Sequence, residues 1–148
     1  MISYMELHEQ NHKITELSNV LSYLINERSM CDTDVSCELF FRYVNMVKDH
    51  LETEERELYQ LLLMDDDNDV RNTGRKFLSG SGEIKRVFGQ YLKRWCKGKE
   101  LRIRDHDAFV RDTREIFGLV IRRIDDEIVH LYPTLLECGH IPRTAHAA

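Results

Sequence analysis

Two pairs of ionisable residues stand at helical spacing within apolar stripes, where they could do chemistry. His50 and Glu54 lie one helical turn apart, and Arg123 and Glu127 repeat that spacing further along the chain. Each pair continues a stripe of apolar residues, so a helix would turn these side chains toward the protein interior. Buried ionisable groups are costly unless they pair with one another or bind a metal. The sequence therefore predicts one buried polar cluster, able to hold a metal ion or to pair its own charges.

The two pairs belong to an internal repeat. The stretch HLETEERELYQLLL, which holds the first pair, aligns without a gap on RIDDEIVHLYPTLL, which holds the second. In this alignment Glu54 matches Glu127, and Tyr59 matches Tyr132. Two related helical hairpins about an approximate twofold axis would bring the polar pairs together. We expect both tyrosines to be core residues whose hydroxyl lies at the edge of the core.

Four helical segments are needed to position these residues. Their apolar residues recur at spacings of three and four, and the segments are residues 3–28, residues 34–64, a third carrying Phe77 to Trp95, and residues 105–137. The acidic run from Asp65 to Asp69 suits the N-terminus of the third helix, and Gly98 is expected to stop it. Amphipathic helices with short connections favour antiparallel neighbours. We predict an all-α fold, an antiparallel up-and-down four-helix bundle with little room for strands.

The ends of these segments carry further expectations. Residues 1–138 are predicted to form the bundle, and residues 139–148 a frayed tail. Within that tail His140 and His146 are expected to be exposed to solvent. His106 is expected to start the last helix, with Asp105 or its near neighbour Asp107 as the cap.

The composition suits one globular helical domain. The chain has 148 residues, of which 42% are hydrophobic and 32% are charged, as in folded proteins with a substantial core. The net charge of -5 and the lack of a basic stripe argue against nucleic-acid binding. The apolar runs are shorter than the ~20 residues that span a bilayer, and the N-terminus does not resemble a signal peptide. The cysteines lie far apart, so we expect the reduced thiols of a cytoplasmic protein.

Parts of the chain resemble the hemerythrin-like (HHE) domain family. The segment FFRYVNMVKDHLETEERELY is a close match to the second helix of that family, and RRIDDEIVHLYPTLL is a partial match to its fourth. The family pattern is an H-x-x-x-E step followed by L-Y-P on both helices, and the likeness extends over nearly the whole chain. The resemblance implies a four-helix bundle in which two carboxylates bridge a pair of irons, while histidines on all four helices complete the coordination.

Part of the family's ligand set is present. By the resemblance, His50, Glu54 and Glu127 occupy ligand positions with residue types that bind metals. His12 is a tentative further ligand, because it points away from the apolar stripe of an ideal helix and needs a local irregularity to reach the site. His130 flanks the stripe of the last helix; it could donate into the cluster, although a half-exposed position is expected.

The remaining ligand positions carry other residue types. Where the family has histidines, this sequence has Asn11, Ser81 and Arg123. A full di-iron centre is therefore not expected, and the cofactor is either none or iron at a single site. The Arg123 guanidinium could instead join Glu54 and Glu127 by paired hydrogen bonds, supplying the positive charge that a cation gives in the family.

Two functions remain open from the sequence. The first is a regulatory or sensory bundle that binds a protein partner and holds no metal or one metal. The arrangement of His50 and Arg123-x-x-x-Glu127 also resembles, more loosely, bacterial anti-sigma proteins of the regulator-of-sigma-D type. The alternative is a non-haem iron protein that senses or handles oxygen, nitric oxide or redox state. An enzyme is not expected, since the sequence has no clear nucleophile, phosphate loop or acid/base pair.

Overall fold

The protein is mostly helical, as the predicted all-α class requires. The computed structural model describes residues 1–145. The α-helices are α1 (Tyr4–Leu24), α2 (Arg28–Cys31), α3 (Asp34–Glu57), α4 (Tyr59–Leu63), α5 (Asn68–Trp95), α6 (His106–Asp126) and α7 (Tyr132–Glu137). A π-helix, η1 (Glu127–Leu131), joins α6 to α7, and two short strands are β1 (Cys96–Lys97) and β2 (Glu100–Leu101).

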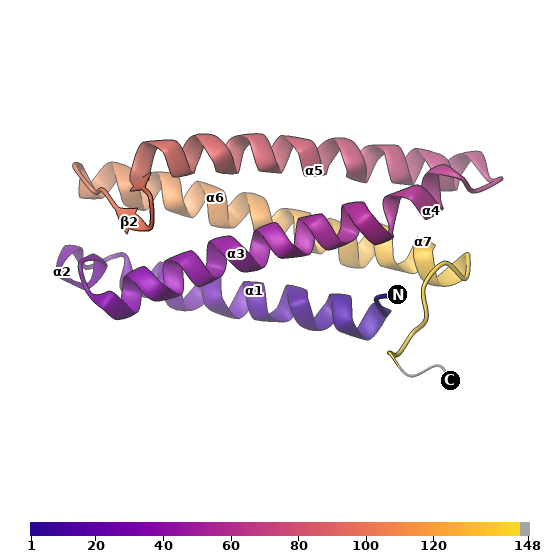
Figure 1. The fold of residues 1–148 in the computed structure, drawn as a ribbon, viewed down its shortest axis with the longest axis horizontal. Helices are drawn as coiled ribbons and strands as arrows, with labels where there is room; N and C mark the ends of the chain where they lie inside the picture. The colour runs from indigo at the N-terminus through magenta and orange to yellow at the C-terminus, as the bar shows by residue number, and fades with distance from the viewer. Residues whose placement is uncertain (146–148) are drawn as a thin grey trace.

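The long helices lie side by side along the long axis of the molecule. Figure 1 shows α1, α3, α5 and α6 in this arrangement, with α2 and β2 at one end and α4 and α7 at the other. Helix α1 packs against α3 and α6, and α5 packs against α3, α4 and α6. Within residues 1–145, no helix combines the length and the apolar character needed to cross a membrane.

Side-chain caps fix where the long helices begin. The N-cap residues of α1, α3, α5 and α6 each accept a hydrogen bond from the first turn, and they are Ser3, Thr33, Asp67 and Asp105. Such caps satisfy backbone N–H groups that have no partner inside the helix. The acidic run before α5 therefore acts as predicted, and Asp105 is the cap of the last long helix.

A layer of buried polar residues divides the apolar core in two. One apolar cluster fills the end of the molecule near α2, and a second fills the end near α4 and α7. On each long helix, or just beyond it, one buried polar residue separates the two clusters. These residues are Asn11, Glu54, Ser81 and Glu127. The buried charged residues of the described chain gather at this one level, whereas the two ends of the core are mainly apolar, with single buried hydroxyls such as those of Ser18 and Thr113.

Two of the predicted helices are interrupted, and at matching positions of the repeat. Helix α3 ends at Glu57, and Leu58 takes a less regular conformation, with φ -111°, before α4 begins. The last helix changes from α6 to η1 at Glu127. Each irregularity shifts the helical phase, and in α4 Leu62 is buried while Leu61 is only half-buried. The prediction of one continuous helix in each of these segments is therefore wrong.

A small hairpin replaces the plain helix stop predicted at Gly98. Strands β1 and β2 pair antiparallel, with Cys96 opposite Leu101. Gly98 forms the turn between them with φ +63°, in a left-handed region that residues with a Cβ atom rarely adopt. The backbone N–H of Arg102 also donates to the carbonyl of Trp95, at 2.7 Å. The helical pattern of the sequence predicted few or no strands. Each strand of this hairpin has only two residues, too few to show the alternation of polar and apolar residues that predicts a strand.

The described part of the tail packs onto the bundle and is not frayed as predicted. Ile141 is 5% exposed and belongs to the second apolar cluster. The backbone N–H of Tyr4 donates to the carbonyl of Pro142 at 2.9 Å, which ties the tail to the start of α1. His140, expected in solvent, is half-buried and contacts Asp65. His146 lies outside the described residues.

Candidate functional site

The predicted polar cluster forms where α3 faces the junction of α6 and η1. We call His50, Glu54, Arg123 and Glu127 the central cluster. His50 and Glu54 come from α3, Arg123 from the end of α6, and Glu127 from the start of η1. All four side chains are buried, and Arg123 is the most exposed of them at 8%. One ligand atom each from His50, Glu54 and Glu127 lies within 4.8 Å of the other two.

Arg123 joins the two carboxylates, as its position in the sequence suggested. Its Nε donates to Glu127 Oε2 at 3.0 Å, and its Nη2 lies 3.6 Å from Glu54 Oε1. Its Nη1 donates to the carbonyl oxygen of Phe77 at 2.9 Å, and the guanidinium lies 4.8 Å from the centre of the Phe77 ring. Helix α5 approaches closely here, because a Cβ atom on Gly80 would lie 2.9 Å from Nη1. The guanidinium is thus held on several sides.

His50 is placed to carry a positive charge. Its Nε2 lies 2.9 Å from Glu127 Oε1 and 3.4 Å from Glu54 Oε2, and its Nδ1 lies 2.8 Å from Gln10 Oε1. With oxygen acceptors at both ring nitrogens, the imidazolium form satisfies every contact. Burial by itself lowers the pKa of His50, but the two neighbouring carboxylates outweigh burial and raise this pKa to about 10.

The two carboxyl groups differ in their affinity for a proton. Burial and the charge of Glu127 raise the pKa of Glu54. Burial also tends to raise the pKa of Glu127, but hydrogen bonding to His50 and the charges of His50 and Arg123 lower it overall. When both carboxyls are ionised, they balance the two cations, and the central cluster is neutral as a whole.

Two tyrosine hydroxyls complete the cluster, and sequence reasoning misplaced them. The Tyr59 hydroxyl donates to Glu54 Oε1 at 3.3 Å and accepts a hydrogen bond from Arg123 Nη2. The Tyr132 hydroxyl donates to Glu127 Oε1 at 2.9 Å. Both tyrosines are at most 2% exposed, so their hydroxyls lie inside the core and not at its edge.

The helix irregularities explain why these tyrosines reach the cluster. Each tyrosine follows its glutamate by five residues, which places the two side chains about 140° apart on a regular α-helix. The break at Leu58 and the π-helix η1 each alter that phase, so both hydroxyls turn back to their own glutamate. The shared E-x-x-x-x-Y spacing in the two repeats was the available signal.

Asn11 joins the cluster, but Ser81 does not. Asn11 Nδ2 donates to the Tyr132 hydroxyl at 2.8 Å and to Glu127 Oε1 at 3.3 Å. Among the described residues, its Oδ1 has no hydrogen-bond partner. Ser81 is fully buried, yet its hydroxyl donates to Glu55 Oε1 at 3.0 Å and not to a residue of the central cluster.

The two other histidines considered for the site lie outside it. His12 is exposed and pairs with Glu16 on the surface of α1, with its Nε2 2.9 Å from Glu16 Oε1. Helix α1 is regular there, so Asn11 faces the core and the tentative ligand role of His12 is wrong. His130 is exposed as well, because the π-helix turns this position to solvent.

The donor set of the central cluster does not fit the di-iron centre implied by the resemblance. In the imidazolium form, His50 Nε2 carries the proton directed at Glu127 and offers no lone pair to a metal. Arg123 places a permanent positive charge within 3.6 Å of both carboxylates, and this charge repels a further cation. The chain thus supplies the two positive charges that its carboxylates require.

We compared the chain with protein-family models, with curated proteins and with solved structures, and none of them matches it.

Proposed function

We propose that the protein is an up-and-down four-helix bundle of the hemerythrin-like type in which Arg123 takes the place of the metal. We further propose that it acts as a regulatory module that binds another protein. The observation that carries the first part is the buried Arg123 guanidinium, which donates a hydrogen bond to Glu127 and forms an ion pair with Glu54. The polar layer supports the family assignment, because it falls at the positions that the resemblance gives to the metal ligands.

The hydrogen bonding of the central cluster favours a structural role for it. Its cations and carboxylates pair with one another, and tyrosine hydroxyls occupy further acceptor positions. A buried polar network of this kind rigidifies a core and favours one packing arrangement. Since the side chains of the cluster are buried, we propose that the protein acts through its surface.

A groove between α3 and α5 is the surface best suited to a partner. It has a volume of about 930 Å³, and its apolar lining includes Phe41, Val44 and Leu92. Charged residues of both signs, such as Asp49 and Lys93, also line it. An apolar floor with a charged rim is the usual anatomy of a protein interface, and an amphipathic helix is a partner of fitting shape.

Iron content tests the first part of the proposal. Tag-free protein is reconstituted with ferrous iron under anaerobic conditions, desalted and analysed by mass spectrometry, alongside a His50→Gln variant. We expect both proteins to retain far less than one iron per chain. A variant with Asn11→His, Ser81→His and Arg123→His restores the family's histidines and serves as the positive control. Near-stoichiometric iron in the wild type that is lost in His50→Gln would overturn the proposal.

A single non-haem iron site is the second candidate function. It is favoured by the three potential ligand atoms that lie within 4.8 Å of one another, since such a set leaves positions open for a small molecule. This function requires Arg123 to leave the carboxylates and His50 to lose a proton. Its signature would be iron retention together with a new absorption band when nitric oxide is added to the ferrous protein.

Site-specific photo-crosslinking tests the second part. A photoreactive residue is placed at Leu92 in the groove, and a control is placed at the exposed Val20 of α1. We expect one protein to be crosslinked from Leu92 and not from Val20. Identical crosslinking from both positions, or none from the groove, would argue against this surface.

A further inference from the structure

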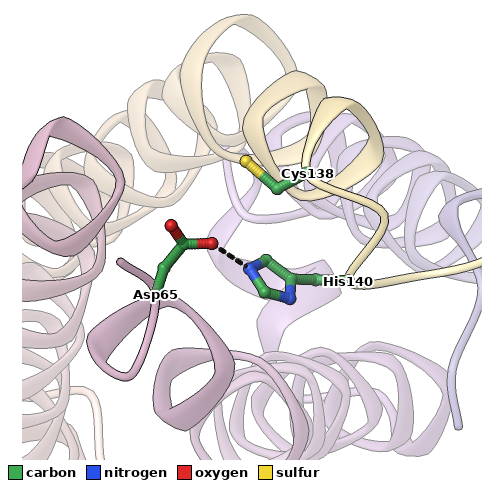
Figure 2. A group of neighbouring side chains, drawn as sticks. All are labelled: Asp65, Cys138 and His140. Atoms are coloured by element: carbon green, nitrogen blue, oxygen red, sulfur yellow. Dashed lines mark hydrogen bonds and ion pairs between the residues drawn. The ribbon is translucent and has the colours of Figure 1, made fainter. Parts of the chain in front are cut away.

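A second group of metal-binding side chains lies at the end of the molecule near α4 and α7. We call Asp65, Cys138 and His140 the outer cluster. Asp65 follows α4, and the other two residues follow α7. Figure 2 shows the three side chains directed into the space between these two segments. A carboxylate oxygen, a thiol sulfur and an imidazole nitrogen lie within 4.8 Å of one another, and His140 Nε2 is 2.7 Å from Asp65 Oδ2.

The turn after α7 holds two of these side chains in place. Gly139 has φ +70°, the left-handed conformation that commonly ends a helix. The N–H of Gly139 donates to the carbonyl of Leu136 at 3.1 Å. The N–H of His140 donates to the carbonyl of Leu135 at 2.9 Å. These bonds close the turn, so Cys138 and His140 both face Asp65 (Figure 2).

Asp65 is fixed with one carboxylate oxygen turned to the outer cluster. Its Oδ1 accepts a hydrogen bond from the N–H of Asp67 at 2.8 Å, and its carbonyl oxygen accepts one from Arg71 Nη1 at 2.7 Å. These contacts leave Oδ2 to face His140. The hydrogen bonds from Asp67 and His140 lower the pKa of Asp65, so this oxygen is an ionised donor near neutral pH.

Negative charge gathers around the thiol. The carboxylates of Asp65, Asp67 and Glu137 lie near the Cys138 thiol. Their negative charges favour a divalent cation at this place. Arg71 donates to the backbone carbonyl of Asp65, and among the described residues no arginine forms a salt bridge with the Asp65 carboxylate, in contrast to the central cluster.

We propose that Asp65, Cys138 and His140 bind one Zn²⁺ ion, with a water molecule as the fourth ligand. Mixed sulfur, nitrogen and oxygen donors favour zinc over magnesium or calcium, and zinc prefers a tetrahedral arrangement. Tetrahedral ligand atoms lie roughly 3.4–3.8 Å apart, given zinc bond lengths of ~2.0–2.3 Å. The His140 nitrogen and the Asp65 oxygen, 2.7 Å apart, need to separate to reach this geometry, and none of the three side chains is fully buried.

Zinc at this place would fasten three segments together. On binding, the Cys138 sulfur bonds to zinc and its proton passes to solvent, while the imidazole nitrogen that faces Asp65 gives up any proton and binds through its lone pair. The ion then links the α4–α5 connection to the turn after α7. That turn continues to Pro142, whose carbonyl oxygen holds the N–H of Tyr4, so the clamp extends to the start of α1.

Cobalt binding tests the proposal. Chelator-treated, tag-free protein is titrated with Co²⁺, which reports a thiolate ligand by a near-ultraviolet charge-transfer band and a tetrahedral site by visible bands. We expect both signals to saturate at one equivalent and to disappear when Zn²⁺ is added. Zinc at about a hundredfold excess over its Kd should raise the melting temperature by roughly 5–10 °C.

Matched variants separate this site from other sites. Cys138→Ser should abolish the charge-transfer band, whereas Cys37→Ser, which alters a thiol in the groove between α3 and α5, should retain it. Asp65→Asn and His140→Gln should each weaken cobalt binding about tenfold or more. A wild-type protein without the band, or a band that survives Cys138→Ser and is lost in His50→Gln, would overturn the proposal; the latter outcome would place the metal in the central cluster and count against the proposed function too.

Discussion

The central and outer clusters both gather metal-binding residue types, but they differ in what balances their negative charge. In the central cluster, Arg123 lies within 3.6 Å of both carboxylates, and His50 supplies a second cation. In the outer cluster the donors lie near further carboxylates, while His140 contacts the Asp65 carboxylate and Arg71 contacts the Asp65 backbone carbonyl. Metal-binding residue types that lie close together therefore do not by themselves make a metal site. A positively charged side chain of the same protein can balance the carboxylates in place of a metal ion.

Removing Arg123 should have the largest effect on the central cluster. Arg123→Ala removes a buried cation that contacts both buried carboxyl groups, so we expect the free energy of unfolding to fall by about 3–5 kcal/mol. The neighbouring Arg122 is exposed, and Arg122→Ala should change stability by no more than about 0.5 kcal/mol. Urea unfolding of both variants measures the difference. If Arg123→Ala lowers the free energy of unfolding by no more than about 0.5 kcal/mol, as expected for a surface residue, the guanidinium does not balance the carboxylates.

Alkaline pH should weaken the central cluster through His50. Because the pKa of His50 rises from 6.5 to about 10 on folding, its stabilising contribution is complete below pH 6.5 and is lost as the pH rises toward 10. The expected slope is at most about 1.4 kcal/mol per pH unit. Unfolding free energies measured from pH 7 to 10 should fall less steeply in His50→Gln than in the wild type. His12→Gln, which changes an exposed histidine, should leave the slope unchanged.

Loss of one tyrosine hydroxyl should have an intermediate effect. Tyr132→Phe removes a group that donates to Glu127 and accepts from Asn11, so we expect a loss of about 1–3 kcal/mol. Tyr23 is 82% exposed, and Tyr23→Phe provides the matched control. Equal stabilities of the two variants in chemical denaturation would show that the buried hydroxyl adds nothing to the cluster.

Disrupting the outer cluster in the metal-free protein should have the smallest effect on stability. The pair between His140 and Asp65 is partly exposed, with side chains 21% and 18% accessible. In the presence of a chelator we expect His140→Gln to lower stability by no more than about 1 kcal/mol. With zinc added, the same variant should lack the rise in melting temperature seen for the wild type. A loss of several kcal/mol under chelation would mean that the outer cluster, like the central one, balances its own charges.

The central cluster could be predicted because its residues follow helical periodicity. His50, Glu54, Arg123 and Glu127 each continue an apolar stripe, and a regular helix carries such positions inward. Asn11, which is buried, was identified instead by the resemblance, as the residue at a ligand position of the family. The helix phase was therefore sufficient wherever the helices are regular, and the all-α class depended on that regularity alone.

The features that could not be predicted depend on irregular backbone or on distant contacts. Tyr59 and Tyr132 reach the cluster through turns that break the helical phase. The break at Leu58 has no Gly or Pro beside it, whereas Pro133 follows the π-helix η1 and indicates a disturbed turn without indicating which contacts result. The contact between Asp65 and His140 joins residues 75 positions apart. No local pattern reports such a pairing, so the tail was assigned to solvent and the outer cluster was missed.

The π-helix η1 has a consequence for changes in chain length. Val129 is 61% exposed, and a one-residue deletion at such a surface position would ordinarily be tolerated within a loop. Here the deletion would convert the wide turn of η1 into an ordinary α-helical turn. Tyr132 would then follow Glu127 by four residues, which lie on one face of an α-helix, and the turn that carries Cys138 and His140 would keep its orientation toward Asp65. The wide turn therefore accommodates one residue of chain length while it keeps both clusters aligned.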